Sequence, residues 1–250
     1  MSDSKLTEKR FMDLAKQANR KGIVCFSDFL TLNELYIFQS LSGQLESTGQ
    51  IYGGYEGAER QLVAFIPDAL YYDWEYPISC LQITPSYPKF AEKLSHRDIL
   101  GALMNLGIQR DKLGDILAGE NGYYFFCKEE MTAYLMEHLT QVSHTQVHCD
   151  IVSTEEVSSL HPNTEVYEKI IASNRLDSLI AAMTGISRSQ AVTLINAGKI
   201  AINGAECLNH SYQLKPRDVI SIRGYGKYLF DGISGETRKN KIKESFEKYV

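Results

Sequence analysis

Apolar residues recur every three or four positions in two stretches near the start of the chain, at residues 6–18 and 32–45. This spacing predicts two amphipathic helices, because side chains three and four positions apart lie on one face of a helix. A glycine-rich turn at residues 53–57 and an apolar run at residues 61–66 predict one strand. We therefore expect an α-rich N-terminal domain over residues 1–76.

In the middle of the chain the apolar pattern alternates between strand and helix periods. The predicted elements are a strand at 78–84, a helix at 98–106, strands at 114–118 and 123–127, a helix at 129–142 and a strand at 145–151. A short hairpin over residues 119–122 joins the two central strands. This βαββαβ order predicts a ferredoxin-like domain over residues 77–155, within an α+β protein.

Ferredoxin-like sheets often bind RNA through exposed aromatic residues of the third strand. Tyr123 and Phe125 fit that signature here, whereas Asn121, Tyr124 and Lys128 do not. An ordinary RNA-recognition motif is therefore not expected. A sheet face that carries Tyr123 and Phe125 could still stack on a base.

Two further helices are predicted near the C-terminus. The first begins at Leu176 and ends at Gly185. Ser187 and Gln190 form a capping box that starts the second helix, and Gly198 ends it in a left-handed conformation. The remaining predicted features are a strand and turn at 199–204, a strand at 219–223 and a basic tail at 236–250, which leaves a small domain at 174–235.

Charge is distributed unevenly along the chain. The net charge of −5 excludes a uniformly basic nucleic-acid coat protein. Residues 1–173 hold 14 basic and 24 acidic residues, whereas residues 174–250 hold 12 basic and 7 acidic residues. The C-terminal part therefore attracts phosphate, as expected of a region that contacts nucleic acid, although a solvated basic surface would give the same count.

Two cations flank the second C-terminal helix. Arg188 lies in its first turn, where free backbone amides attract anions, and Lys199 lies just past its end. A phosphate backbone that runs along this helix would contact both residues. The same domain carries four further arginine or lysine residues, which are Arg175, Lys215, Arg217 and Arg223.

A set of residues in the last quarter of the chain follows a known pattern. These residues are Arg175-Leu176-Asp177, Gly185, Ser187-Arg188, Ala191, Leu194-Ile195, Gly198, Ile202-Asn203-Gly204, Pro216 and Asp218. The set resembles the S4 domain, the RNA-binding module of ribosomal protein S4, pseudouridine synthases and tyrosyl-tRNA synthetase. The resemblance implies an RNA face lined by Arg175, Ser187, Arg188, Lys199 and Asn203. It also implies a structural role for Asp177, and Arg217 departs from the glycine that the family usually has.

Three further stretches narrow the resemblance. They are the segment 96–108 with Arg110 and 114–116, the segment 223–228 with Lys227, and the basic run 238–243. Together with the S4 pattern they resemble the YlmH family of bacterial ribosome-associated proteins. That resemblance implies binding to rRNA of the large ribosomal subunit and to tRNA, a part in the rescue of stalled translation, and a link to cell division. Lys227 joins the residues expected to contact RNA.

Known catalytic signatures are incomplete in this sequence. Residues 96–98 resemble the kinase catalytic loop, but Leu103 stands where a magnesium-binding Asn is needed. Three His and one Cys lie within residues 138–149, without a Cys-x-x-Cys pair to support a zinc site. We therefore expect a protein that is not an enzyme and has no metal or cofactor. The alternative is an RNA-modifying enzyme, of pseudouridine synthase or methyltransferase type, that uses the S4 domain to hold substrate.

The surroundings of the protein are also indicated by the sequence. The chain starts without an apolar signal core and has no run of about 18 apolar residues, so we expect a cytoplasmic protein that does not bind membranes.

Five widely spaced cysteines are expected to be reduced core residues. We expect a monomer. The acidic N-terminal domain, with the aromatic segment 71–76, could contact a protein partner, or these aromatics could join the domain cores.

Overall fold

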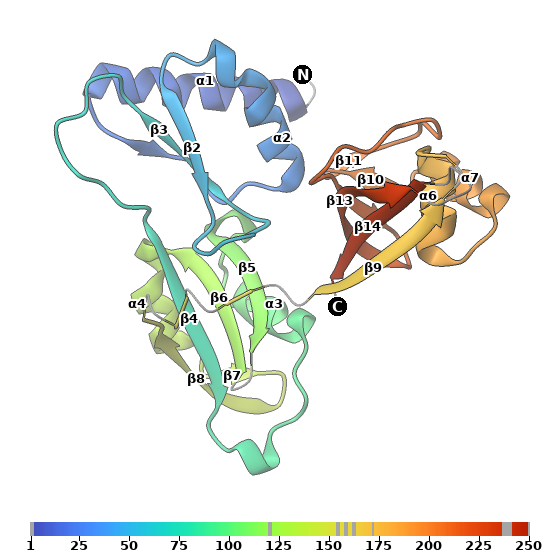
Figure 1. Cartoon of the computed structure of the whole chain (residues 1–250). Helices are drawn as coiled ribbons and strands as arrows, with labels where there is room; N and C mark the ends of the chain where they lie inside the picture. Colours follow the sequence, from blue (N-terminus) through green and yellow to red (C-terminus); the bar gives the residue numbers. More distant parts are fainter. Residues whose placement is uncertain are drawn as a thin grey trace. The chain divides into compact units, whose positions relative to one another are not determined.

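The computed structural model describes residues 3–119, 122–153, 156–157, 160–161, 164–171, 173–236 and 242–249. The chain forms two compact units, unit 1 (Met1–Pro162) and unit 2 (Asn163–Val250) (Figure 1). No helix among the described residues has both the length and the apolar content needed to cross a membrane.

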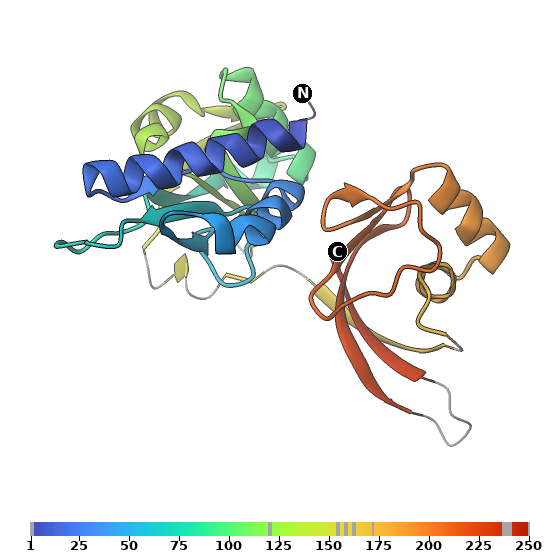
Figure 2. The same ribbon diagram turned by 90° about the horizontal axis from the view of Figure 1, so that it is seen from above.

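Unit 1 begins with two helices packed on a small antiparallel sheet. The helices are α1 (Asp3–Lys21) and α2 (Leu32–Leu41), and the strands are β1 (Cys25–Phe26), β2 (Thr48–Tyr52) and β3 (Leu62–Ile66), in the order β1-β3-β2. A short 3-10 turn, Ser42–Gln44, follows α2. Phe11, Phe38 and Phe65 meet between the layers with ring centroids 5.8, 6.2 and 5.9 Å apart. Figure 2 shows α1 running across this part of the unit.

The two predicted helices and the strand near residue 62 are confirmed, but the N-terminal part is not only helical. β2 was missed because it is an edge strand with four of its five residues exposed. A strand that buries neither face leaves no alternation of apolar and polar residues in the sequence.

The rest of unit 1 is a five-stranded antiparallel sheet with two helices. In chain order its elements are β4 (Ile78–Pro85), α3 (His96–Asn105), β5 (Leu113–Gly119), β6 (Gly122–Lys128), α4 (Thr132–His138), β7 (Gln141–Val142) and β8 (Thr145–Ile151). The strand order is β5-β6-β4-β8-β7, so the first and third strands of the βαββαβ motif are neighbours at its centre. The predicted ferredoxin-like fold is confirmed.

The predicted helix at 129–142 and the predicted hairpin at 119–122 need separate comment. The predicted helix at 129–142 is shorter, because Glu129–Met131 is a 3-10 turn and Gln141–Val142 pairs with β8 across a turn at Ser143, whose φ is 50°. Glu120 and Asn121, at the centre of the predicted hairpin, lie outside the described residues.

Tyr123 and Phe125 lie on the face of the sheet that the helices cover. Phe125 is fully buried in the core with residues of α3 and α4, and the Tyr123 hydroxyl donates to the Leu94 carbonyl at 2.8 Å. The hypothesis that these two rings stack on a base is therefore wrong. Neighbouring residues of a strand point to opposite faces, so the aromatic signature alone could not tell which rings the helices cover.

The N-terminal part covers the opposite face of the sheet. The Tyr55 ring stacks on Phe126 with centroids 4.9 Å apart. The Asp115 carboxylate accepts hydrogen bonds from the Tyr55 hydroxyl at 2.8 Å and from the backbone amides of Glu59 and Arg60 at 2.6 and 3.1 Å. Residues on both sides of position 76 therefore share one core, and the predicted boundary there does not separate two independent domains.

The aromatic segment 71–76 is divided between core and surface. Trp74 and Tyr76 each pack against the Phe26 ring with centroids 5.8 Å apart. Burial raises the pKa of Tyr76 to about 12. Tyr71, in contrast, is 94% exposed. A protein partner at this segment stays a prediction.

Unit 2 joins two helices to a six-stranded antiparallel sheet. Its elements are β9 (Thr164–Ile171), α6 (Leu176–Thr184), α7 (Arg188–Asn196), β10 (Ile200–Ile202), β11 (Ala205–Glu206), β12 (Val219–Ile222), β13 (Gly226–Glu236) and β14 (Ile242–Tyr249). The strand order is β11-β10-β12-β13-β14-β9. The two predicted helices are confirmed, and Gly185 ends α6 in the left-handed conformation with φ 76°.

The predicted basic tail at 236–250 is wrong for most of its length. β14 pairs with both β13 and β9, and Phe246 is fully buried with its ring 5.2 Å from that of Phe230. Residues 237–241 of the predicted tail lie outside the described residues. Unit 2 thus extends beyond 174–235 at both ends, because β9 and β14 complete its sheet.

Most cysteines lie in the cores. Cys25, Cys80, Cys127 and Cys149 are buried and free, and Cys207 is partly exposed and free. Burial raises the pKa of the Cys80 and Cys127 thiols to about 12, so these thiols are protonated at neutral pH. The prediction of reduced core cysteines is confirmed for the four buried residues.

Candidate nucleic-acid interface

Two arginines of unit 2 share one buried carboxylate. Asp177, in the first turn of α6, has a side chain that is only 4% exposed. It accepts hydrogen bonds from Arg175 Nε at 3.3 Å and from Arg188 Nε at 3.0 Å, and each guanidinium makes a second contact to it. Both arginine side chains stay exposed, by 40% and 55%. We call Arg175, Asp177 and Arg188 the Asp177 clamp, which fixes two guanidinium groups while leaving them accessible.

The Asp177 carboxylate stays ionised. Burial raises its pKa, but the hydrogen bonds from Arg175 and Arg188 outweigh burial and hold the pKa below its ordinary value. The expectation that Asp177 holds a basic side chain is confirmed. Replacing Arg188 by Glu would place a second carboxylate beside the buried Asp177. This variant would therefore disturb the fold as well as any RNA contact.

The helix α7 begins as predicted. The Ser187 hydroxyl accepts from the Gln190 amide at 3.3 Å, and the Gln190 side-chain oxygen accepts from the Ser187 amide at 2.9 Å. The Ser187 side chain therefore serves the start of the helix, beside the positive charge of Arg188. Lys199 lies past the other end of this helix, roughly 13 Å further along the axis for nine residues.

Lys199, Arg223 and Lys227 come together at one end of the sheet of unit 2. The Arg223 amide donates to the Lys199 carbonyl at 2.9 Å, and Lys227 pairs with Ser221 between β12 and β13. The three cations line a groove of about 600 Å³, together with Glu206 and with the glycines Gly198, Gly204, Gly224 and Gly226. We call it the basic groove. Glycines lack side chains that would block a phosphate from approaching the backbone and the cations.

Asn203 and Asp218 build a turn at the opposite end of β10 and β12. Asn203 Nδ2 donates to Asp218 Oδ1 at 2.8 Å, and its Oδ1 accepts from the Val219 amide at 2.9 Å. Asp218 is 6% exposed and also accepts from the Lys215 amide at 2.9 Å. Because both polar atoms of the Asn203 side chain are used within this turn, Asn203 has a structural role, and its contact with RNA stays a prediction.

Arg217 occupies a left-handed position in the same turn. Its φ is 74°, and its amide donates to the Phe230 carbonyl at 2.7 Å. Glycine adopts this conformation without steric cost, which explains the glycine that S4 domains usually have here. The turn is kept in this chain, and an exposed cation stands in place of the glycine. Lys215 is exposed in the same turn.

The nine residues predicted to contact RNA therefore fall into three groups. They are Arg175, Ser187 and Arg188 at the corner between α6 and α7, Lys199, Arg223 and Lys227 in the basic groove, and Asn203, Lys215 and Arg217 at the Asp218 turn. The sequence did not indicate one aromatic neighbour of the basic groove. This residue is Tyr249, whose ring centroid lies 5.9 Å from Lys227 Nζ.

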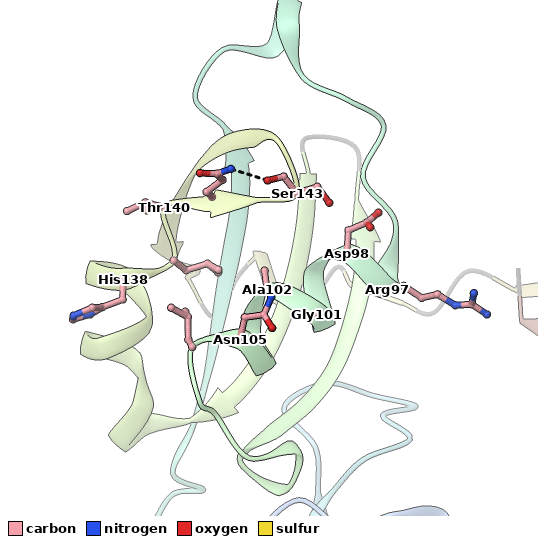
Figure 3. Close-up of a pocket in the computed structure, with 11 residues that line it drawn as sticks. Arg97, Asp98, Gly101, Ala102, Asn105, His138, Thr140 and Ser143 are labelled. Atoms are coloured by element: carbon pink, nitrogen blue, oxygen red, sulfur yellow. Dashed lines mark hydrogen bonds between the residues drawn. The ribbon is translucent and has the colours of Figure 1, made fainter.

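Unit 1 has a separate pocket of about 480 Å³ between α3 and the segment from α4 to β7 (Figure 3). Two of its polar side chains are engaged elsewhere: the Asp98 carboxylate accepts from the Ser95 hydroxyl at 2.6 Å, and the His138 ring stacks on Tyr134 with centroids 4.3 Å apart. Figure 3 shows Arg97 and His138 pointing away from the hollow. Among the described residues, no cluster of three or more His, Cys, Asp or Glu could hold a metal ion.

Two protein-family models match this chain. The model described as "Putative RNA-binding domain in YlmH" matches residues 73–156, which contain the ferredoxin-like sheet. The S4 domain model matches residues 174–220, which contain the Asp177 clamp and the Asp218 turn. These two matches confirm the predicted resemblance to the YlmH family.

Two known proteins are similar to this chain. The chain is 27% identical over 249 residues to "Ribosome-associated protein quality control protein P2" of Bacillus subtilis (strain 168), which covers 96% of this chain and 95% of that protein. The structure of "Cell division protein ylmH from Streptococcus pneumoniae" matches with a TM-score of 0.52 and 21% identity, over 64% of this chain and 96% of that chain. The second likeness supports the fold alone.

The S4 match divides the predicted binding residues. Seven of the nine residues predicted to contact RNA lie within residues 174–220. Arg223 and Lys227 lie beyond the match, in the turn and strand that follow β12. The basic groove therefore joins a residue of the S4 match, Lys199, to residues outside it.

Proposed function

We propose that this protein binds structured RNA through unit 2, on the large ribosomal subunit and together with tRNA, and acts in the rescue of stalled translation in the cytoplasm. The S4 domain and the domain named for RNA binding in YlmH support RNA as the ligand. The name of the Bacillus subtilis relative supports a ribosome-associated role in quality control. A link to cell division comes only from the name of the Streptococcus pneumoniae structure.

The Asp177 clamp is the observation that carries this proposal. A free arginine side chain loses rotamer freedom when it binds a phosphate, which weakens binding. Here Asp177 already holds Arg175 and Arg188 in place. Fixed guanidinium groups suit phosphates at set spacings, so recognition would follow the shape of a folded RNA backbone more than its base sequence.

We also propose that the protein acts by binding and does not catalyse a reaction. The alternative is an RNA-modifying enzyme that uses the S4 domain to hold substrate. No observation among the described residues favours it, since Asp98 in the pocket of unit 1 caps a helix and the His138 ring stacks on Tyr134. The test below separates the two possibilities by where the protein is found in a cell lysate.

The test is sedimentation of lysate through a sucrose gradient at low and moderate salt, with the variant Lys199→Glu/Arg223→Glu beside the parent protein. Both side chains are exposed and neither takes part in a salt bridge among the described residues, so the fold should be kept. We expect the parent to migrate with the large subunit and the variant to stay at the top. Affinity for tRNA and rRNA fragments should fall at least about tenfold.

A matched control changes the same charge elsewhere. Lys9→Glu/Lys16→Glu alters two exposed lysines of α1 and should leave migration unchanged. Equal losses from both variants would show that net charge matters and the basic groove does not. A parent protein that stays at the top at both salt concentrations would contradict ribosome binding and place the enzyme alternative first.

A further inference from the structure

The loop between β4 and α3, residues 86–94, presents two aromatic rings to solvent. Tyr87, which is 64% exposed, directly precedes the 3-10 turn Pro88–Phe90, and Phe90, which is 87% exposed, is the last residue of that turn. Figure 1 shows the chain projecting beyond the end of the sheet after β4. Large apolar side chains that gather on a surface instead of a core indicate a binding surface.

Both ends of the 86–94 loop are fastened to the sheet. The Ser86 amide donates to the Gln146 carbonyl at 2.9 Å, and the Glu92 amide donates to the Thr145 hydroxyl at 3.2 Å. Leu94 is 9% exposed and closes the loop against the core. The two rings are therefore presented by an ordered turn, so a ligand would lose less of its binding free energy to ordering the loop.

The charge of the loop is opposite to that of the unit around it. Lys89, Lys93 and Arg97 are exposed, and Glu92 is the one acidic residue within 86–97. Among the described residues none of these three cations takes part in a salt bridge. Residues 1–173 as a whole carry a net charge of −10. Positive charge interleaved with exposed rings suits a ligand that has both phosphates and flat bases.

We propose that the 86–94 loop binds an unpaired segment of RNA, with bases stacked on Tyr87 and Phe90 and phosphates beside Lys89 and Lys93. Unpaired RNA is the form whose bases are free to stack on side chains, since the bases of a duplex already stack on one another. This site lies at the end of the sheet, away from the face that the N-terminal part covers at Phe126. It adds a second RNA-binding surface to the one in unit 2 and does not depend on it.

The test measures binding of a fluorescent oligouridine of about twelve nucleotides to the full chain by anisotropy. The parent carries Lys199→Glu/Arg223→Glu, so that the basic groove contributes little. We expect the further change Tyr87→Ala/Phe90→Ala to lower the affinity at least about tenfold, because stacking on both rings is lost. Both rings are exposed, so thermal unfolding should be unchanged.

A matched control removes an exposed ring from acidic surroundings in the same unit. Tyr71→Ala, between Asp68 and Asp73, should leave oligouridine binding unchanged. Lys89→Glu/Lys93→Glu should weaken binding and flatten its salt dependence. These results together would support the proposal and would stand even if the variant of the basic groove still migrated with ribosomes.

Three outcomes would overturn the proposal. They are failure of the parent to bind oligouridine, unchanged affinity after loss of both rings, and an equal loss with Tyr71→Ala. A loop variant that leaves the ribosome in the gradient but keeps its affinity for oligouridine would show that the loop contacts protein, which also overturns it.

Discussion

The two units use their cations in opposite ways. In unit 1 the partnered cations hold the protein together: Arg60 donates to the Leu113 carbonyl at 2.9 Å, and Lys112 and Lys128 both bind Asp28, at 2.7 and 3.0 Å. In unit 2 the side chains of four cations are exposed, and these are Lys199, Lys215, Arg217 and Arg223. Net charge therefore says less about a ligand than whether each cation stays accessible, since Arg175 and Arg188 remain 40% and 55% exposed although they bind Asp177.

The units also differ in how they bury a carboxylate. In unit 1 Asp115 accepts three hydrogen bonds, from Tyr55, Glu59 and Arg60. In unit 2 Glu244 is fully buried, and neither of its oxygens has a hydrogen-bond partner among the described residues. Burial raises the pKa of both groups, and that of Glu244 to about 7. One carboxylate should thus stabilise its unit and the other should destabilise its unit when ionised.

The largest expected effect is loss of Asp115. Asp115→Ala leaves the Tyr55 hydroxyl and two backbone amides without their acceptor, so we expect unit 1 to lose about 4 kcal/mol of stability. Urea unfolding followed by the fluorescence of Trp74 measures this, because the chain has one tryptophan and it lies in unit 1. Asp150→Ala, at an exposed site of β8, is the control. A comparable loss in the control would refute a special role for Asp115.

Glu244→Gln should have the next largest effect, with the opposite sign. The folded pKa of Glu244, about 7, lies above the ordinary value of 4.5, so its contribution to stability is greatest below pH 4.5 and is lost as the pH rises through 7. Glutamine has no charge to bury. We therefore expect little change at pH 4 and a gain of about 3 kcal/mol at pH 8, at 1.4 kcal/mol per pKa unit.

Hydrogen exchange of the β14 amides as a function of pH measures this gain. Glu247→Gln, in the same strand, is the matched control and should have little effect, because Glu247 is partly exposed. A gain from Glu244→Gln that is the same at pH 4 and pH 8 would contradict the titration of Glu244 as its cause.

Asp177→Asn distinguishes fixed cations from net charge in unit 2. The change makes the protein one charge more positive, so long-range attraction alone predicts tighter RNA binding. Loss of the clamp frees Arg175 and Arg188, and we expect binding to weaken by about threefold to tenfold instead. Filter binding of tRNA and rRNA fragments measures the difference, with Asp231→Asn as a charge-matched control outside the clamp. Tighter binding by Asp177→Asn would show that the clamp does not position the arginines for RNA.

The helices and the ferredoxin-like order were predictable because their apolar residues face one core. The capping box at Ser187 and Gln190 was equally readable, since it depends on residues three positions apart. Pairing between strands that lie far apart in the chain could not be predicted from local patterns of this kind. The sequence of β14 predicts a tail because its charges outnumber its apolar residues, whereas its strand form depends on β9, more than 70 residues earlier in the chain.

The candidate site was predicted residue by residue but not as groups. Local motifs identified Arg188, Lys199 and Asn203, but only the fold shows that Asn203 is tied to Asp218 and that Lys199 lies beside Arg223. Strand register also decides which rings of β6 face the helices and which face the N-terminal part, and this depends on neighbours in the sheet. The exposed rings of the 86–94 loop were missed for the converse reason, because an aromatic residue in a sequence is first expected in a core.

The smallest expected effect tests whether the Asp218 turn trades stability for charge. Arg217→Gly relieves the left-handed conformation at φ 74°, and we expect a gain of about 0.5 kcal/mol after the greater entropy of glycine in the unfolded chain is counted. RNA affinity should fall about twofold to threefold, because one exposed cation is lost. Arg217→Ala separates the two effects, since it removes the charge but keeps the strain, and it should lose the same affinity without gaining stability.

If glycine is no more stabilising than alanine, the turn is not strained. If neither variant changes affinity, the cation at position 217 lies outside the RNA-binding surface, and that surface is confined to the Asp177 clamp and the basic groove.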